Sequence, residues 1–291
     1  MSTVRLAATQ MTCSWDRGEN LKKAEALVRD AASRGAQIIQ LQELFETPYF
    51  CQKQKAEYFD LATALEENPA VRHFQGIARE LEVVLPIPFF ERAGNAYFNS
   101  VAVIDADGEV LGVYRKTHIP DSPGYLEKYY FSPGDTGYRV WPTRYTKIGI
   151  GICWDQWFPE AARAMALLGA EIVLYPSAIG SVPGAPGFDS APAWQRVMQG
   201  HAIANLMAVA ACNRIGVERI DDSEITWFGS SFITDPLGEK LAEADRSSEG
   251  VTLADIDLDL LRVTRNGFLF FRDRRPETYA SLLSLTGEAP R

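Results

Sequence analysis

Three residues of types that carry out hydrolytic chemistry each stand at the end of a predicted β-strand: Glu43, Lys116 and Cys153. Sites in α/β proteins are built where the carboxyl ends of strands meet, so we expect these side chains to converge. A thiolate attacks a carbonyl carbon, and a carboxylate takes the thiol proton and then serves the leaving amine and the incoming water. A charged lysine stabilises the thiolate and the oxyanion. The three residues together predict a thiol hydrolase.

The predicted nucleophile lies within the stretch Lys147-Ile-Gly-Ile-Gly-Ile-Cys-Trp-Asp-Gln-Trp-Phe-Pro-Glu160. Pro159 opens a helical pattern, because proline suits the first turn of a helix, where its missing N–H has no partner. Cys153 is therefore expected on a sharp turn between a buried strand and a helix. There, backbone N–H groups such as that of Trp154 stabilise negative charge. The alternative is a buried structural cysteine, since free cysteine is among the most buried residue types.

A segment rich in Pro, Gly and Tyr, residues 116–142, shows no regular period. Long irregular loops within compact chains are usually functional. Glu127 in this loop is a candidate to orient Lys116 or a substrate, although its spacing alone favours a surface charge. His118 keeps a Cys–His hydrolase open as an alternative, while a lone histidine close to a proline is more often structural.

Composition excludes several other classes of function. The 291 residues carry 29 Lys and Arg against 38 Asp and Glu, a net charge of −9, which argues against nucleic acid or an anionic membrane as partner. Four scattered cysteines without a C-x-x-C pair indicate a reduced, cytoplasmic protein. No apolar run reaches membrane-spanning length, and no secretory pattern is present. The three histidines do not suggest a metal site, and the sequence contains no nucleotide fingerprint.

Strand and helix patterns alternate without a linker, which predicts one α/β domain over 1–291. Asn20 is expected to cap the first helix. Gly-Ala-Gln-Ile-Ile at 35–39 and Gly-Ala-Glu-Ile-Val at 169–173 close two similar strand–helix–strand units, which indicates a layered fold of two related halves. One strand is expected over 226–234, and an arm at about 268–291 is expected to pack on a neighbouring subunit or on its own domain.

Three blocks, taken in order, resemble the signature of the nitrilase, or carbon–nitrogen hydrolase, superfamily. They are Gln42-Glu43, Tyr114-Arg-Lys-Thr-His-Ile-Pro120 and Gly151-Ile-Cys-Trp-Asp-Gln-Trp-Phe-Pro-Glu160. The resemblance covers nearly the whole chain. It implies a four-layer αββα sandwich, a Glu–Lys–Cys triad without metal or cofactor, and a homodimer or larger assembly. Further segments, among them Cys212-Asn-Arg-Ile-Gly216, resemble a branch of the family that acts on linear carbamoyl groups.

Matched by position, the resemblance implies a role for each site residue. Glu43 is the proton acceptor, Lys116 the oxyanion and proton-donor lysine, and Cys153 the nucleophile that carries a carbamoyl thioester until water cleaves it. Glu127 matches a supporting second glutamate. A related carbamoyl or ω-amide hydrolase with the same triad stays open, as does a non-enzymatic binding subunit that retains the fold.

The resemblance also implies which residues meet a small cationic substrate. Tyr49 and Trp154 match residues that line the pocket. A cationic tail needs an acidic or carbonyl-rich end to that pocket, for which Asp121 and Asp189 are candidates. The Pro/Gly-rich segment 181–189 departs from the family pattern, so it leaves the preferred length of the substrate open.

Overall fold

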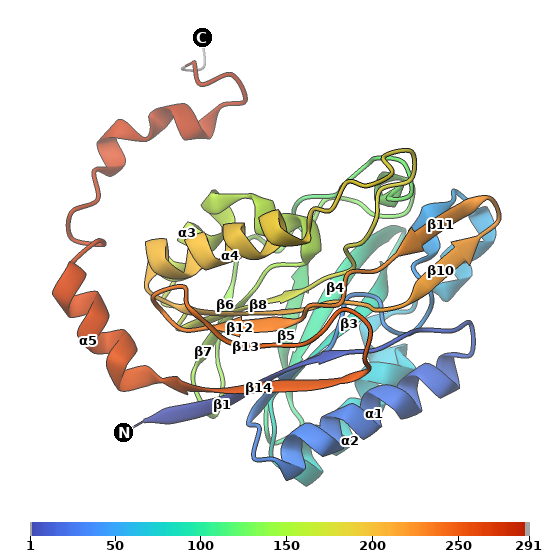
Figure 1. Ribbon diagram of the computed structural model, residues 1–291, viewed down its shortest axis with the longest axis horizontal. Coiled ribbons are helices and arrows are strands. Elements are labelled where there is room, and N and C mark those ends of the chain that lie inside the picture. Colours follow the sequence, from blue (N-terminus) through green and yellow to red (C-terminus); the bar gives the residue numbers. More distant parts are fainter. Residues whose placement is uncertain (1, 289–291) are drawn as a thin grey trace.

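The structure is a computed structural model that describes residues 2–288, and two β-sheets lie face to face at its centre (Figure 1). One sheet consists, in spatial order, of β13 (Lys240–Glu243), β12 (Phe232–Thr234), β9 (Ala208–Cys212), β8 (Ile172–Pro176), β7 (Lys147–Ile150) and β6 (Val140–Pro142). The other consists of β14 (Gly250–Asp257), β1 (Thr3–Gln10) and β2 (Ile38–Gln40), followed by β3 (Leu85–Ala93), β4 (Ala96–Ile104) and β5 (Val110–Arg115). A bridge between Ile38 and Val84 joins the two halves of this second sheet.

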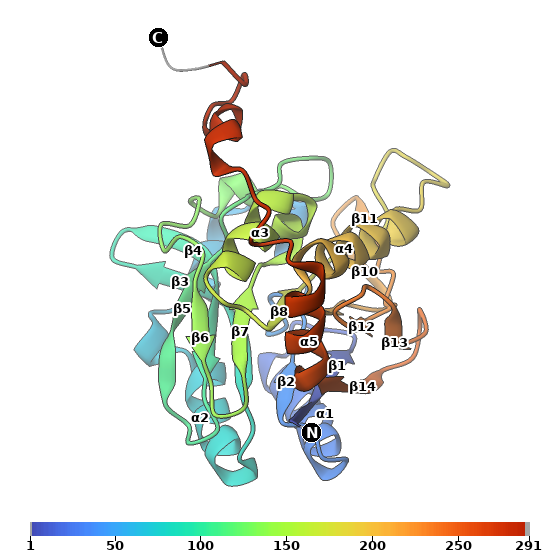
Figure 2. The same cartoon turned by 90° about the vertical axis from the view of Figure 1, so that its left-hand side faces the viewer.

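Helices cover the outer face of each sheet, which makes four layers (Figure 2). Helices α1 (Arg17–Ser33) and α2 (Pro69–Leu81) pack on the sheet of β1–β5, and α3 (Pro159–Leu167) and α4 (Ala191–Asn205) pack on the sheet of β6–β9. The remaining elements are the hairpin β10 (Val217–Ile220) and β11 (Ser223–Thr226), the helix α5 (Leu258–Phe268), and 3₁₀ helices at Phe50–Gln52, Ala56–Leu61, Leu65–Glu67, Glu127–Tyr129, Cys153–Trp157, Pro276–Thr278 and Ala280–Leu283. The predicted αββα sandwich is confirmed.

Side chains along each strand point alternately to the two faces of its sheet, and this alternation decides which of them form the core. Leu6 and Ala8 of β1 point between the sheets and meet side chains such as Leu174 of β8, while Ala7 points outward to the helical layer. Both faces of each sheet are thus covered, which explains why these strands read as continuous apolar runs. The layer between the sheets contains Cys153 at its margin.

Two details of the sequence interpretation are wrong. Asp16, rather than Asn20, caps α1 by accepting a hydrogen bond from the Glu19 N–H, and the buried Asn20 amide instead donates to loop carbonyl groups. The strand expected over 226–234 is interrupted between β11 and β12. Gly229 and Ser230 both have φ of +55°, a left-handed conformation that ends an extended chain.

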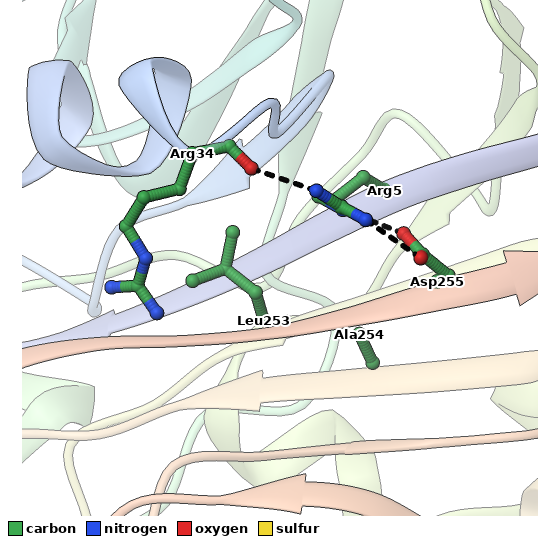
Figure 3. Close-up of a pocket in the computed structure, with 5 residues that line it drawn as sticks. All are labelled: Arg5, Arg34, Leu253, Ala254 and Asp255. Atoms are coloured by element: carbon green, nitrogen blue, oxygen red, sulfur yellow. Dashed lines mark hydrogen bonds and ion pairs between the residues drawn. The ribbon is translucent and has the colours of Figure 1, made fainter.

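The first and last strands are tied together at the end of α1 (Figure 3). The Arg5 guanidinium donates to both carboxylate oxygens of Asp255, at 2.6 and 2.8 Å, and to the main-chain oxygen of Arg34 at 2.9 Å. Beyond α5, an arm extends away from the body (Figures 1 and 2), and its residues 289–291 lie outside the described part of the chain. Within residues 2–288, no helix has the length and apolar character needed to cross a membrane.

Close packing beside β7 explains the glycines that precede the predicted nucleophile. A Cβ atom on Gly151 would lie 2.7 Å from the buried ring of Tyr175, and one on Gly149 would lie 2.8 Å from the sulfur of Met165. Both distances are too short for a non-bonded contact. These glycines therefore let α3 and β8 approach the strand that leads to Cys153.

We expect Gly151→Ala to lower the free energy of unfolding by about 1–3 kcal/mol, because an extra methyl group must displace a rigid, buried ring. Gly200→Ala is the matched control. Gly200 lies in α4 with open space around it. Its replacement by alanine should leave the free energy of unfolding unchanged or raise it by about 0.5–1 kcal/mol. Urea denaturation of both variants measures the difference, and equal stabilities would contradict the packing argument.

Candidate active site

Cys153 lies on a tight turn between strand and helix. Strand β7 ends at Ile150, Cys153 opens a 3₁₀ helix, and α3 begins at Pro159. The φ angle of Cys153 is +42°, a conformation that is rare for residues other than glycine and costs about 1–3 kcal/mol. The buried carboxylate of Asp155 holds the turn by accepting hydrogen bonds from the Ile152 N–H at 2.9 Å and the Tyr114 hydroxyl at 2.7 Å.

Lys116 is a fully buried ammonium group held between two buried carboxylates. Its Nζ lies 2.8 Å from Glu43 Oε1 and 2.7 Å from Glu127 Oε2. Each carboxylate has one further donor, Asn99 Nδ2 for Glu43 and the Tyr49 hydroxyl for Glu127, at 2.7 and 2.6 Å. Three polar groups from distant parts of the sequence are thereby fixed in one charged cluster.

The two oxygens of Glu43 differ in their surroundings. Oε1 accepts hydrogen bonds from Lys116 and Asn99, whereas Oε2 is buried and has no hydrogen-bond partner among residues 2–288. A buried acceptor without a donor is unfavourable, so this oxygen is open to a hydrogen bond from a group that enters the site. One oxygen therefore anchors the side chain and the other can act as a base.

Burial and charge set the protonation of the cluster. Burial raises the pKa of the Cys153 thiol well above its ordinary value, and Glu43 raises it further against the opposing effect of Lys116. The predicted nucleophile is therefore a thiol at rest, and attack by its sulfur would need a base. Burial lowers the pKa of Lys116, but Glu127 and Glu43 outweigh burial and raise it, so the lysine stays charged. Burial raises the pKa of Glu127 to about 7, although Lys116 opposes this.

A cavity of about 380 Å³ opens in front of this cluster. Cys153 and Glu127 line it together, and its wall is largely apolar and includes the aromatic residues Tyr125, Trp154, Trp157 and Phe188. Among the described residues, no lysine or arginine lines the cavity. The site can thus receive a small molecule with an uncharged reacting group and a cationic or apolar tail.

The structure brings only part of the predicted substrate-binding set to this cavity. Trp154 lines it, while Tyr49 lies behind the wall as the hydrogen-bond donor to Glu127. Asp189 accepts a hydrogen bond from the Ala191 N–H at the start of α4 and pairs with Arg246, and Asp121 is exposed. Neither aspartate is among the lining residues, although Val182 and Phe188 of the segment 181–189 are.

His118, the residue of the alternative Cys–His arrangement, is engaged elsewhere. Its Nδ1 lies 2.7 Å from Asp155 Oδ1, and its ring stacks on Phe158 with centroids 3.6 Å apart. The Cys153 sulfur instead donates weakly to the Ala178 carbonyl at 3.7 Å. Within residues 2–288, no group of three or more His, Cys, Asp and Glu side chains is placed to hold a metal ion.

Sequence reasoning missed Asn99 and Asp155, which position the predicted catalytic groups. Asn99 interrupts the apolar run of β4, and a polar residue in a buried strand is the signal that points to it. Asp155 follows Cys153 by two residues, but an acidic residue in a turn is common. Only the three-dimensional structure shows that it accepts bonds from two main-chain N–H groups and a tyrosine.

Comparison with known proteins now identifies the class of the molecule. Residues 5–266 match the family model for carbon-nitrogen hydrolases, and the chain belongs to this family, as its sequence blocks predicted. A crystal structure of a carbon-nitrogen hydrolase from Helicobacter pylori G27 has a TM-score of 0.92 and 40% sequence identity, covering 97% of this chain and 99% of that one.

Relatives with two different names are similar to the chain over almost their whole length. The chain is 54% identical to an N-carbamoylputrescine amidase from Oryza sativa subsp. japonica, over 99% of this chain and 97% of the rice protein. It is 53% identical to a citrullinase from Francisella tularensis subsp. tularensis, over 97% of this chain and 99% of that protein.

Because burial raises the pKa of Glu127 from 4.5 to about 7, the folded chain binds this proton more tightly than the unfolded chain does. Its stabilising contribution, roughly 3 kcal/mol for a shift of this size, is therefore complete below pH 4.5 and lost as the pH rises through about 7. Glu127→Gln removes the titrating group. The free energy of unfolding, measured with urea, should then fall less between about pH 5 and about pH 8 in the variant than in the wild type. An equal fall in both proteins would refute the raised pKa of Glu127.

Proposed function

We propose that the protein hydrolyses N-carbamoylputrescine to putrescine, ammonia and carbon dioxide, a step of polyamine biosynthesis. The observation that carries this proposal is the buried cluster of Lys116 with Glu43 and Glu127, of which Glu127 lines one cavity together with Cys153. Similarity to N-carbamoylputrescine amidases, at 53–55% identity in four plants, supports the choice of substrate.

In the proposed first step, the Cys153 sulfur attacks the carbonyl carbon of the carbamoyl group. Its proton passes to the free oxygen of Glu43 and from there to the departing amine, as the carbon–nitrogen bond breaks and a thioester forms. The charge on the carbonyl oxygen is stabilised by Lys116 and by a backbone N–H such as that of Trp154. Water then attacks the thioester while Glu43 takes its proton and returns it to the sulfur. The carbamate released breaks down to carbon dioxide and the second nitrogen product, which is ammonia if putrescine left in the first step and putrescine if ammonia did.

Lys116 and Glu127 act in this scheme as a fixed electrostatic pair. Lys116 stays charged because two carboxylates hold it, and its position next to Glu43 keeps the base oriented. Glu127 in turn is held by the Tyr49 hydroxyl. Dipoles and charges fixed before the reaction need no reorganisation during it, which is the main source of electrostatic catalysis.

The cavity wall supports a cationic tail on the substrate. Aromatic faces attract ammonium groups by about 0.5–2 kcal/mol, and Trp154, Trp157 and Tyr125 all line the cavity. A carboxylate on the tail would find no lysine or arginine among the described lining residues. This disfavours carbamoyl-β-alanine and ω-amide acids. Citrulline, which carries a carboxylate beside its amine, is the second candidate, because a citrullinase is 53% identical to this chain.

Release of ammonia should be strong with N-carbamoylputrescine and weak with L-citrulline, N-carbamoyl-β-alanine and glutaramate, measured in parallel with purified protein. Cys153→Ala should abolish release, because no other group can carry the thioester. Glu43→Gln should lower kcat by about 10²–10⁴-fold, the usual contribution of a general base. Lys116→Ala should lower kcat at least as much.

Other outcomes separate the alternatives. His118→Ala should keep most of its activity, and loss there with normal turnover in Glu43→Gln would establish a Cys–His hydrolase instead. Strong release from citrulline would retain the triad and change the substrate. Release from no carbamoyl or amide compound, with Cys153 unreactive toward an alkylating agent, would favour a binding subunit.

We also propose that the chain is one hydrolase domain whose C-terminal arm, from about residue 268, packs on a second copy in a homodimer or larger assembly. The arm projects from the body and exposes Leu282, Leu283 and Leu285, with Leu283 at 86% of its full exposure. Leu167 and Leu168, at the end of α3, are also exposed. Exposed apolar side chains that gather on one segment mark a site of contact with another protein more often than singly scattered ones do. All four cysteines are free thiols, which supports the cytoplasm as the location of the protein.

Replacing Leu282 and Leu283 by serine should shift the protein toward smaller species in size-exclusion chromatography with light scattering, because the arm loses the apolar surface that a partner covers. Leu241→Ser is the control, since Leu241 is equally apolar and half exposed but lies on β13. An unchanged mass for the arm variant, or an equal shift in the control, would exclude the arm as the contact.

A further inference from the structure

Arg214 is a fully buried arginine that binds the main chain of the loop after β2. Its Nη2 donates to the carbonyl oxygen of Glu43 at 3.0 Å and to that of Leu44, and its Nη1 donates to the carbonyl oxygen of Thr47 at 3.0 Å. The loop that begins at Glu43 therefore turns three carbonyl groups toward a single guanidinium. Arg214 lies just beyond β9, in the opposite sheet, within the segment Cys212–Gly216 that sequence reasoning left without a role.

The partner of Arg214 holds the far end of the same loop. Arg214 Nη1 lies 2.8 Å from Glu218 Oε1, and the other oxygen of Glu218 accepts a hydrogen bond from the Tyr49 N–H at 2.7 Å. Tyr49 is the residue whose hydroxyl binds Glu127. The ion pair thus fixes the loop at two points, one at Glu43 and one at Tyr49.

The geometry of the loop requires such an external support. Leu44 has φ of +49°, which is unfavourable for a branched side chain and persists only when the surroundings enforce it. Carbonyl groups that converge on one point also repel one another unless a donor with several N–H directions lies between them. A guanidinium offers five N–H groups in a fixed plane, whereas an ammonium offers three on a flexible stem.

The ion pair is expensive to bury, which argues that it serves a purpose other than stability. Burial lowers the pKa of Arg214, but Glu218 outweighs burial and raises it, so the group remains charged. Apolar residues of similar size often stabilise a core as well as a buried ion pair does. Arg214 is not among the described residues that line the cavity, so it has no contact with a substrate there.

We propose that Arg214, with Glu218, is a positioning residue that sets the place of the Glu43 carboxylate through the main-chain oxygens of its loop. This inference rests on the proposed role of Glu43 as the base. Displacement of a catalytic group by about 1 Å typically costs 10²-fold in rate, so the support matters even though it lies outside the cavity.

The test compares Arg214→Lys and Glu218→Gln with Arg265→Lys. Arg265 also donates to two main-chain oxygens, those of Leu206 and Ala170, but at the end of the molecule where α5 packs. In the folded Arg214 and Glu218 variants, kcat should fall by about 10²-fold with KM changed less than about threefold. The Arg265 variant should lose stability only. Normal kcat in folded Arg214→Lys would overturn the proposal.

A second readout needs no substrate, so it separates this inference from the proposed activity. The rate of Cys153 alkylation by iodoacetamide reports the thiolate, and the Glu43 charge raises the pKa of this thiol. In both Arg214→Lys and Glu218→Gln, displacement of Glu43 should move the alkylation profile to lower pH, toward the profile of Glu43→Gln. The Arg265 variant should follow the wild type. A wild-type profile in the folded Arg214 and Glu218 variants would overturn the positioning role whether or not carbamoylputrescine is the substrate.

Discussion

The burial of one ammonium between two carboxylates governs the rest of the site. Lys116 and its partners Glu43 and Glu127 are almost completely shielded from water. The loss of hydration is unfavourable for each charge, and only close, well-aligned contacts can offset it. The cluster has one negative charge in excess when both carboxylates are ionised. Burial, reinforced by the negative charge of Glu43, raises the pKa of Glu127 to about 7 and raises the pKa of the Cys153 thiol well above its ordinary value, so the thiol keeps its proton at rest. The proposed base, Glu43, is therefore held in the same buried cluster that sets the protonation of the proposed nucleophile.

The sequence indicated the residues predicted to carry out the chemistry better than the residues that hold them in place. Glu43, Lys116 and Cys153 could be found because strand ends are visible in the apolar pattern and because their types suit hydrolysis. The αββα layers followed from the family blocks. Supports such as Asn99 and Arg214 could not be assigned, since their role depends on which buried acceptor they reach, and that is a long-range property.

The errors in the interpretation have a common physical origin. Local signals compete, and tertiary contacts decide between them. Asn20 has the side chain of a helix cap, but it lies where two loop carbonyl groups need a donor, and Asp16 caps the helix instead. The contact of Asp189 with a cationic tail stays a prediction, and in the structure this carboxylate accepts a hydrogen bond at the start of α4 and pairs with Arg246.

The site joins the two sheets, and this arrangement sets a requirement that the apolar core alone does not meet. Glu43 and Lys116 come from the sheet of β2 and β5, and Cys153 comes from the sheet of β7. Apolar contact between the sheets is strong but has no direction, so it fixes the relative position of two polar groups less sharply than hydrogen bonds do. Two sets of hydrogen bonds at the site cross between the sheets, one donated from each sheet to the other. The Tyr114 hydroxyl on β5 binds Asp155 in the turn of the nucleophile, and Arg214 beyond β9 binds the loop of Glu43. Together they fix the thiol and the carboxylate relative to each other, which is what proton transfer between them demands.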